Sequence, residues 1–160
     1  MANPLSVLFL CTGNSCRSIM AEALLAHHGG SRFLSHSAGS FPTGDVHPKS
    51  LATLKAHGIA TTDYQSKSWD EFTDQPIDIV ITVCDTVASE ICPIFPGEPL
   101  KAHWGVPDPA KFEGSEEATG QEFNRIFAML ERRIKALIHL PLESMNKIEL
   151  QRQLETIGTL

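Results

Sequence analysis

Residues 11–18 read Cys-Thr-Gly-Asn-Ser-Cys-Arg-Ser and directly follow the apolar run 5–10. A cysteine and an arginine six positions apart, between a strand and a helix, predict an anion site with a thiol nucleophile. The small residues between them let the chain curl so that backbone N–H groups face one tetrahedral anion. The side chain of Arg17 adds a planar, charged fork that matches two anion oxygens. We therefore expect an oxyanion to be held above Cys11 by Thr12, Gly13, Asn14, Ser15, Cys16, Arg17 and Ser18.

Cys11 can act as a nucleophile only as a thiolate. A free cysteine has a pKa of about 8.5 and is mostly protonated at neutral pH. The helix start near Ser18 and the charge of Arg17 both predict a lowered pKa for Cys11, because positive charge stabilises the thiolate. The alternative is a buried structural cysteine at a strand end, where a small thiol packs well. The position between an apolar strand and an amphipathic helix favours the nucleophile.

Composition restricts the class of protein. The chain has 160 residues, 42% hydrophobic and 20% charged, which is typical of one globular domain. Its net charge of −6 argues against a general nucleic-acid binder, because the phosphate backbone requires a basic face. There is neither an apolar run long enough for a membrane span nor a signal peptide at Met-Ala-Asn-Pro. We expect a cytoplasmic protein with no nucleic-acid or membrane partner, whose cysteines are catalytic, redox-active or metal-binding rather than structural disulfides.

Strand and helix signals alternate along the chain. Strands are expected over 5–10, 32–38, 78–84 and 100–103, and helices over 19–26, 48–56, 119–137 and, after Pro141, 143–160. The apolar runs 5–10 and 78–84 suit a parallel sheet, and 119–137 carries a single apolar stripe. This order predicts an α/β fold with a small parallel sheet. We expect residues 1–140 to form a single catalytic α/β domain and residues 141–160 a C-terminal helical extension that packs on it or on another subunit.

Two further cysteines are expected near the anion loop. In an open parallel sheet, ligands bind beyond the carboxyl ends of the strands. Cys11 and Cys84 are each expected to end a strand, which places both thiols on one rim, and Cys92 follows in the next loop. Three such thiols would permit thiol–disulfide exchange. The alternative is that Cys84 is a core residue and Cys92 an ordinary loop residue. No Cys-x2-Cys or His-x3-His spacing indicates zinc, and no metal site is predicted.

Asp108 stands between Pro107 and Pro109, which stiffen the backbone and hold the carboxyl group in one direction. An acid beside an oxyanion site can protonate a leaving oxygen. An Asp-Pro pair alone more often marks a turn. The spacing does not show whether Asp108 reaches Cys11.

Several segments resemble a known superfamily. The strand Val7-Leu-Phe-Leu10, the loop 11–18 and the helix start Met20-Ala-Glu-Ala23 resemble the low-molecular-weight protein tyrosine phosphatase superfamily. Four later segments resemble its arsenate reductase branch: Ser37-Ala-Gly39, Val83-Cys84-Asp85, His103-Trp-Gly105 and Asp108-Pro-Ala110. The resemblance implies a flavodoxin-like four-stranded parallel sheet flanked by helices.

The resemblance also implies roles for individual residues. Cys11 would be the nucleophile, Arg17 with the loop N–H groups the oxyanion cradle, and Asp108 the proton donor. Cys84 would form a disulfide with Cys11 as arsenite leaves, and Cys92 would resolve it. Phosphate and sulfate would mimic arsenate. No cofactor is expected beyond an external thiol reductant, either thioredoxin or glutathione with glutaredoxin, and the second would leave Cys92 dispensable.

Two alternatives to the reductase remain from the residues alone. A phosphatase acting on phosphotyrosine or small phosphoesters needs only Cys11, Arg17 and Asp108. A non-catalytic oxyanion sensor is disfavoured by the intact nucleophile, arginine and acid. Lys67 stands where some relatives have an acidic residue near a potassium site, so no potassium requirement is predicted, although Asn14, Glu22 and Ser37 match that site.

Overall fold

Strands and helices follow one another in the predicted order. This computed structural model describes residues 4–84 and 94–160. Cys92 and the relay step assigned to it therefore lie outside the described residues. The strands are β1 (Leu5–Cys11), β2 (Phe33–Gly39), β3 (Ile79–Thr82) and β4 (Leu100–His103). The helices are α1 (Arg17–Gly29), α2 (Pro48–Ala56), α4 (Glu116–Ile138) and α5 (Lys147–Ile157).

The four strands form one parallel sheet in the order β2-β1-β3-β4. Cys11 lies opposite Gly39, and Leu10 lies opposite Thr82. The carboxyl ends of β1, β2 and β3 therefore meet at one edge. Because the chain turns from β1 to β2 on one side and reaches β3 on the other, this edge is the switch point at which such sheets bind ligands. The predicted four-stranded parallel fold flanked by helices is confirmed.

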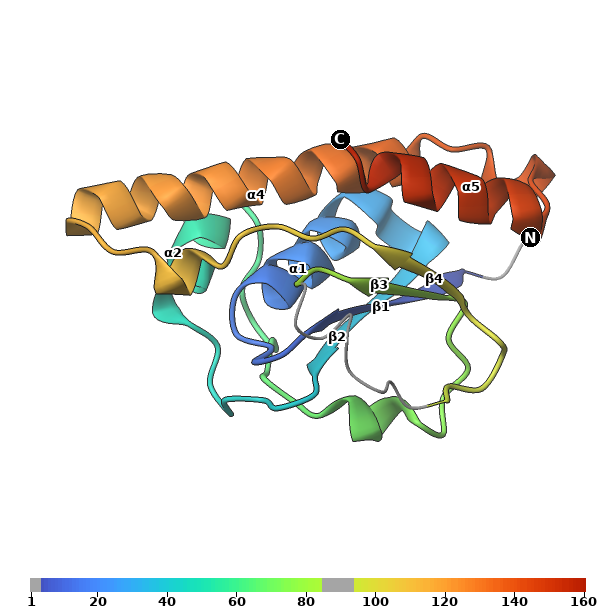
Figure 1. The fold of residues 1–160 in the computed structure, drawn as a ribbon, viewed down its shortest axis with the longest axis horizontal. Coiled ribbons are helices and arrows are strands. Elements are labelled where there is room, and N and C mark those ends of the chain that lie inside the picture. Colours follow the sequence, from blue (N-terminus) through green and yellow to red (C-terminus); the bar gives the residue numbers. More distant parts are fainter. Residues whose placement is uncertain (1–3, 85–93) are drawn as a thin grey trace.

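The core lies between the sheet and the long helix α4. Val7, Leu8, Phe9 and Leu10 of β1 are fully buried. The predicted apolar stripe of α4 is buried over its whole length, at Phe123, Ile126, Phe127, Leu130, Ile134 and Leu137. Helix α1 contacts both the sheet and α4, and it therefore lies between them (Figure 1). This packing holds the start of α1, and with it Arg17, against the end of β1.

The strand expected over 78–84 is shorter than predicted, because β3 ends at Thr82. The chain still follows the sheet beyond that point, since Val83 N–H donates to Leu10 O at 2.9 Å. Cys84 thus lies two residues beyond β3 rather than at its end. It nevertheless reaches the rim on which Cys11 lies.

The C-terminal residues pack on the body of the protein. Helix α5 starts after Asn146, whose side chain accepts from Glu149 N–H at 2.8 Å. Leu154 and Ile157 are buried, and α5 lies against β4 and beside α4 (Figure 1). Ile148, one of the apolar positions of this segment, is 71% exposed. A division of the chain at residue 140 stays a prediction.

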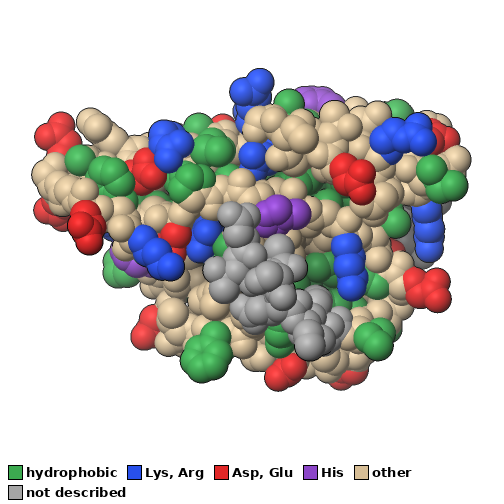
Figure 2. Space-filling view, in the orientation of Figure 1, with side chains coloured by type: hydrophobic (Ala, Val, Ile, Leu, Met, Phe, Trp, Pro, Cys, Tyr) green, Lys and Arg blue, Asp and Glu red, His purple; other side chains and the backbone are tan. Residues whose placement is uncertain are grey.

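Acidic and basic side chains are interspersed over the face shown in Figure 2. Positive charge for an anion must therefore be supplied locally, by residues at the site itself. Within the described ranges, no helix is both long and apolar enough to cross a membrane.

Candidate active site

The loop between β1 and α1 turns its carbonyl groups away from its centre. Thr12 O accepts from Phe41 N–H at 2.9 Å, Gly13 O from Thr43 N–H at 3.0 Å, and Ser15 O from His47 N–H at 3.1 Å. Among the described residues, no acceptor is found for the backbone N–H groups of Gly13, Asn14, Ser15, Cys16 and Arg17. Unpaired N–H groups in a curled loop at a helix start form an anion cradle. The loop also lines a cavity of about 480 Å³.

Asn14 fixes the shape of this loop. It is fully buried and adopts a left-handed backbone with φ of 48°, which asparagine tolerates better than most residues. Its Nδ2 donates to Ser18 Oγ at 2.8 Å and to Ser37 Oγ at 3.0 Å. Its Oδ1 accepts from Lys67 N–H at 2.9 Å. The loop is therefore held by α1, β2 and the segment before β3 together.

Gly39 allows β2 to approach the loop closely. A Cβ atom at this position would lie 2.4 Å from Thr12 O and 2.9 Å from Cys11 O, both backbone atoms. No side chain fits there without moving the cradle. The requirement is one of space, because Gly39 does not adopt a positive φ.

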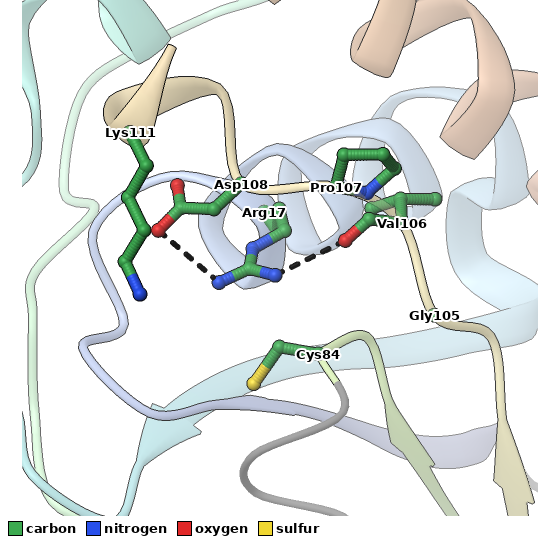
Figure 3. A pocket seen from close by; sticks show the side chains of 7 residues that line it. All are labelled: Arg17, Cys84, Gly105, Val106, Pro107, Asp108 and Lys111. Carbon is green, nitrogen blue, oxygen red and sulfur yellow. Dashed lines mark hydrogen bonds and ion pairs between the residues drawn. The ribbon is translucent and has the colours of Figure 1, made fainter.

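Arg17, the first residue of α1, points its guanidinium across the cavity (Figure 3). Its Nη1 donates to Val106 O at 3.1 Å, and its Nη2 lies 3.4 Å from Asp108 Oδ2. Its Nε is buried and has no hydrogen-bond partner among the described residues. A buried guanidinium nitrogen without an acceptor is costly, so an anion in the cradle would satisfy it.

The structure places Asp108 on the same cavity as Cys11. Its Oδ1 accepts from Ala110 N–H at 3.0 Å and caps the short 3-10 turn Pro109–Lys111, while its Oδ2 faces Arg17. The Asp-Pro pair therefore forms a turn, as such pairs usually do, and the turn aims a carboxyl group into the cavity. From the sequence, a turn at Asp108-Pro109 and an acid beside the anion site were alternatives. In the structure, the same residues form the turn and place the carboxyl group at the cavity.

Cys84 packs directly against Cys11. Its Sγ accepts from Thr12 N–H at 3.3 Å and lies 3.6 Å from Thr12 Oγ1. The Cys11 thiol also forms a hydrogen bond with Cys84. Cys11 and Cys84 are 4% and 2% exposed, respectively. The two sulfurs therefore meet beneath the anion cradle.

This contact overturns the expected pKa of Cys11. The hydrogen bond to Cys84 and then burial raise the pKa of the Cys11 thiol above its usual value, and the opposing effect of Arg17 does not offset them. The local sequence shows the positive charges near Cys11. It shows neither the nearby thiol of Cys84 nor the burial of Cys11.

A second cavity, of about 350 Å³, shares Arg17 with the first (Figure 3). Cys84 lines this cavity and Cys11 lines the first, while Arg17, Asp108 and Lys111 line both. The paired thiols therefore open toward different spaces that share one charged wall.

Cys16 is buried at 3% exposure and lines the first cavity. It accepts a hydrogen bond from Ser15 Oγ at 3.8 Å, and burial raises the pKa of its thiol. This placement agrees with a thiol that packs rather than reacts.

Three residues at the cavity were missed by the sequence argument: Phe41, Thr43 and Lys111. Phe41 is 81% exposed and lies two residues beyond the end of β2. An exposed aromatic residue just past a parallel strand was a usable signal, because that end of β2 shares the edge with Cys11. Lys111 gave no signal, since its position depends on the turn after Asp108.

Glu22, Ser37 and Asn14 come together behind the loop. Ser37 Oγ donates to Glu22 Oε1 at 2.5 Å, and Lys67 Nζ lies 4.0 Å from the same oxygen. Burial raises the pKa of Glu22. The ammonium group of Lys67 thus supplies positive charge beside this carboxyl group. No cluster of three or more His, Cys, Asp or Glu side chains suited to a metal ion occurs in residues 4–84 and 94–160.

Comparisons with known proteins agree with this geometry. Residues 6–153 match the low molecular weight phosphotyrosine protein phosphatase family. This match continues beyond the last sequence motif, Asp108-Pro-Ala110, and includes part of α5. An arsenate reductase of Halalkalibacterium halodurans is 38% identical over 129 residues, which cover 81% of this chain and 91% of that protein.

Two solved structures have the same fold. A thioredoxin-dependent arsenate reductase of Corynebacterium glutamicum is 31% identical, with a TM-score of 0.59 over 84% of this chain. The match spans 64% of that longer chain. An arsenate reductase in a phosphate-binding state is 25% identical, with a TM-score of 0.63 over 84% of this chain and 96% of that one. The chain belongs to the low molecular weight phosphotyrosine protein phosphatase family.

Proposed function

We propose that this chain is an arsenate reductase that uses Cys11 as the nucleophile and Cys84 as the second redox thiol. The observation that carries the proposal is the pair of Cys11 and Cys84 beside loop N–H groups that have no acceptor among the described residues. A hydrolase with this cradle needs only one thiol, whereas reduction of arsenate needs two electrons, which a pair of thiols supplies on forming a disulfide. The relatives named arsenate reductase support the same choice.

In the first step, the Cys11 thiol passes its proton to an oxygen of the arsenate dianion, and the Cys11 sulfur attacks the arsenic atom. A bond forms between sulfur and arsenic, and one arsenate oxygen leaves as water with a proton from Asp108. Arg17 Nε and the loop N–H groups bind the remaining oxygens. This arrangement places hydrogen-bond donors where negative charge accumulates.

In the second step, the Cys84 thiol passes its proton to an oxygen bound to arsenic, and the Cys84 sulfur attacks the Cys11 sulfur. A disulfide forms between the two residues, and the electron pair of the sulfur–arsenic bond passes to arsenic, which leaves as arsenite. Cys84 is near Cys11 before this step, since its Sγ lies 3.3 Å from the backbone N of the next residue, Thr12. Because Cys84 lines the second cavity, its sulfur is the one that an incoming thiol reaches from that side.

The finished disulfide requires an external thiol reductant. We propose thioredoxin, since the Corynebacterium glutamicum relative depends on it, with Cys92 passing the disulfide outward. Glutathione with glutaredoxin is the alternative and would make Cys92 dispensable. Turnover of Cys92→Ser with each reductant distinguishes the two. If turnover is lost with thioredoxin but kept with glutathione and glutaredoxin, the relay through Cys92 is supported. Full turnover with thioredoxin contradicts it. We propose a cytoplasmic location, because the thiol chemistry proposed here requires cysteines kept reduced.

The central test uses Cys84→Ser, which keeps a hydrogen-bonding side chain at the same position. We expect multiple-turnover arsenite release to be lost, while binding of phosphate, measured by calorimetry, stays within about twofold of wild type because the cradle is intact. Full multiple turnover by Cys84→Ser with both reductants would overturn the two-thiol mechanism.

Phosphatase activity is a second candidate, and Phe41 favours it. This exposed aromatic side chain lines the first cavity and supplies an apolar wall of the kind that an aryl phosphate would contact. Hydrolysis of 4-nitrophenyl phosphate by Cys84→Ser, at the wild-type rate or faster, would show that the cradle retains this activity independently of the redox pair.

A further inference from the structure

Arg133 is a buried arginine on α4 whose partners all belong to the backbone. The residue is 4% exposed. Its Nη1 donates to Trp104 O at 3.0 Å and to Gly105 O at 3.3 Å, and its Nη2 donates to Leu160 O at 3.0 Å. Burying a guanidinium costs free energy unless it gains such partners. This arginine therefore holds a particular stretch of chain in place.

That stretch leads directly to Asp108. The carbonyl groups of three consecutive residues, 104–106, each accept from an arginine: the first two from Arg133 and the third from Arg17. On the opposite side, Trp104 N–H donates to Thr82 O at 2.7 Å and Val106 N–H to Val83 O at 3.1 Å. Residues 104–106 are thus fixed between the sheet and two guanidinium groups.

The connection from this stretch to Asp108 is short and stiff. Only Pro107 intervenes, and its ring fixes φ. A displacement of Gly105 or Val106 is therefore passed on to Asp108. It also alters the acceptor that orients Arg17, because Val106 O receives Arg17 Nη1.

The end of α5 packs on the same stretch. Trp104 is fully buried, and its Nε1 donates to Leu154 O at 2.9 Å. A Cβ atom at Gly158 would lie 2.6 Å from His103 O and 2.9 Å from Trp104 Cδ1. Arg133 and the C-terminal residues 154–160 therefore form one brace, which we call the C-terminal brace.

We propose that Arg133, as part of the C-terminal brace, is a positioning residue that sets the direction of the Asp108 carboxyl group toward the anion cradle. This inference rests on the proposed function, in which Asp108 donates the proton to the leaving oxygen. General acids must lie within hydrogen-bond reach of that oxygen, and a misplacement of about 1 Å costs on the order of 100-fold in rate. Among the described residues, the hydrogen bonds of Arg133 reach Trp104, Gly105 and Leu160 and neither the cradle nor a thiol.

The test is a double-mutant cycle on arsenate reduction in a single turnover of the reduced full-length chain. The variants are Arg133→Met, Asp108→Asn and the two combined. Arg132→Met is the matched control, because Arg132 is the exposed neighbour on the same helix and carries the same charge. We expect Arg133→Met to slow the reaction by about 10- to 100-fold in the wild-type background and by less than about twofold in the Asp108→Asn background. Arg133→Lys, which retains the charge and can reach one carbonyl, should recover part of the rate, and Arg132→Met should react at the wild-type rate.

A purely structural role predicts a different result. If Arg133 only stabilised the fold, Arg133→Met would slow both backgrounds by the same factor. That outcome, or no slowing at all, overturns the inference. If Arg133→Met does not fold, as judged by near-ultraviolet circular dichroism, the same cycle with Gly158→Ala decides, because the added Cβ displaces the brace without removing a charge.

Failure of the proposed function gives a distinct result. If Asp108→Asn reacts at the wild-type rate, Asp108 is not the acid, and the inference fails with it. If Asp108→Asn is slow while Arg133→Met acts equally in both backgrounds, only the inference fails. If the wild type reduces no arsenate, the same double-mutant cycle is measured as the rate of hydrolysis of 4-nitrophenyl phosphate, for which Asp108 would be the same proton donor.

Discussion

The thiol of Cys11 forms a hydrogen bond with the sulfur of Cys84 at the edge where β1 and β3 end. The pair has two consequences. It raises the pKa of the Cys11 thiol, because the hydrogen bond and burial both favour the protonated form. It also brings the two sulfurs into contact, which suits the later formation of a disulfide. One contact thus restrains the nucleophile and prepares the redox step.

Removing the second thiol should make Cys11 more acidic. Cys84→Ala deletes the largest cause of the raised pKa, and Arg17 then acts against burial alone. We expect the pKa of Cys11, measured from the pH dependence of iodoacetamide alkylation, to fall relative to wild type. A raised pKa means that the thiolate forms only at higher pH. The alkylation rate of the wild type should therefore be low at neutral pH and should rise at a higher pH than the rate of the variant. Identical pH profiles in the two proteins would contradict the role assigned to this contact. Cys16→Ala, a change outside the pair, is the control for the number of reactive thiols.

Replacing Arg17 by lysine should weaken oxyanion binding. Lysine keeps the positive charge but loses the planar fork and the buried Nε that has no partner among the described residues. The loss of one or two charge-assisted hydrogen bonds, at about 1.5–3 kcal/mol each, predicts a Kd for phosphate raised by at least about 10-fold in Arg17→Lys. Arg152→Lys, an exposed change on α5, should leave the Kd unaltered. Equal phosphate affinity in both variants would show that the fork is not used.

Gly39 should tolerate no side chain. In Gly39→Ala the new Cβ meets backbone oxygens of the cradle, so the loop or β2 must move. We expect the free energy of unfolding to fall by about 1–3 kcal/mol and phosphate binding to weaken. Gly120→Ala is the matched control, because no atom lies within 4 Å of a Cβ there and the site is helical. That change should instead stabilise the protein by about 0.5–1 kcal/mol. Urea denaturation measures both, and destabilisation of the two variants by the same amount would refute the steric argument.

The buried carboxyl group of Glu22 should make stability depend on pH. Burial raises its folded-state pKa above the unfolded value, and the charge of Lys67 opposes this only in part. Such a carboxyl group favours folding while it is protonated, and the contribution is lost as pH rises through the folded-state pKa. Wild type should therefore lose stability relative to Glu22→Gln as the pH rises above about 4.3, the ordinary pKa of a glutamate side chain. Glutamine keeps an acceptor for Ser37 Oγ. Urea denaturation across this range should show no such divergence for Glu117→Gln, an exposed control on α4. A constant difference between wild type and Glu22→Gln at every pH would contradict the assignment.

Local patterns in the sequence were sufficient for much of this protein. The run from residue 5 through residues 11–18 predicted a strand, a curled loop and a helix in that order, because curling of a short loop depends on the small residues within it. The apolar stripe of α4 predicted its buried face, since helical periodicity is a local property. The parallel order of strands predicted that Cys84 would share an edge with Cys11.

The tertiary structure decided what the sequence could not. The direction in which the pKa of Cys11 shifts depends on the sulfur of Cys84, 73 positions away along the chain. The local sequence around Cys11 cannot show this neighbour. Phe41, Lys111 and Arg133 reach the site or its supporting backbone only because turns and the packing of α4 place them there. The type and spacing of residues determine which groups are available for chemistry. Packing of distant segments determines their protonation and direction, because burial and hydrogen-bond partners exist only once the chain is folded.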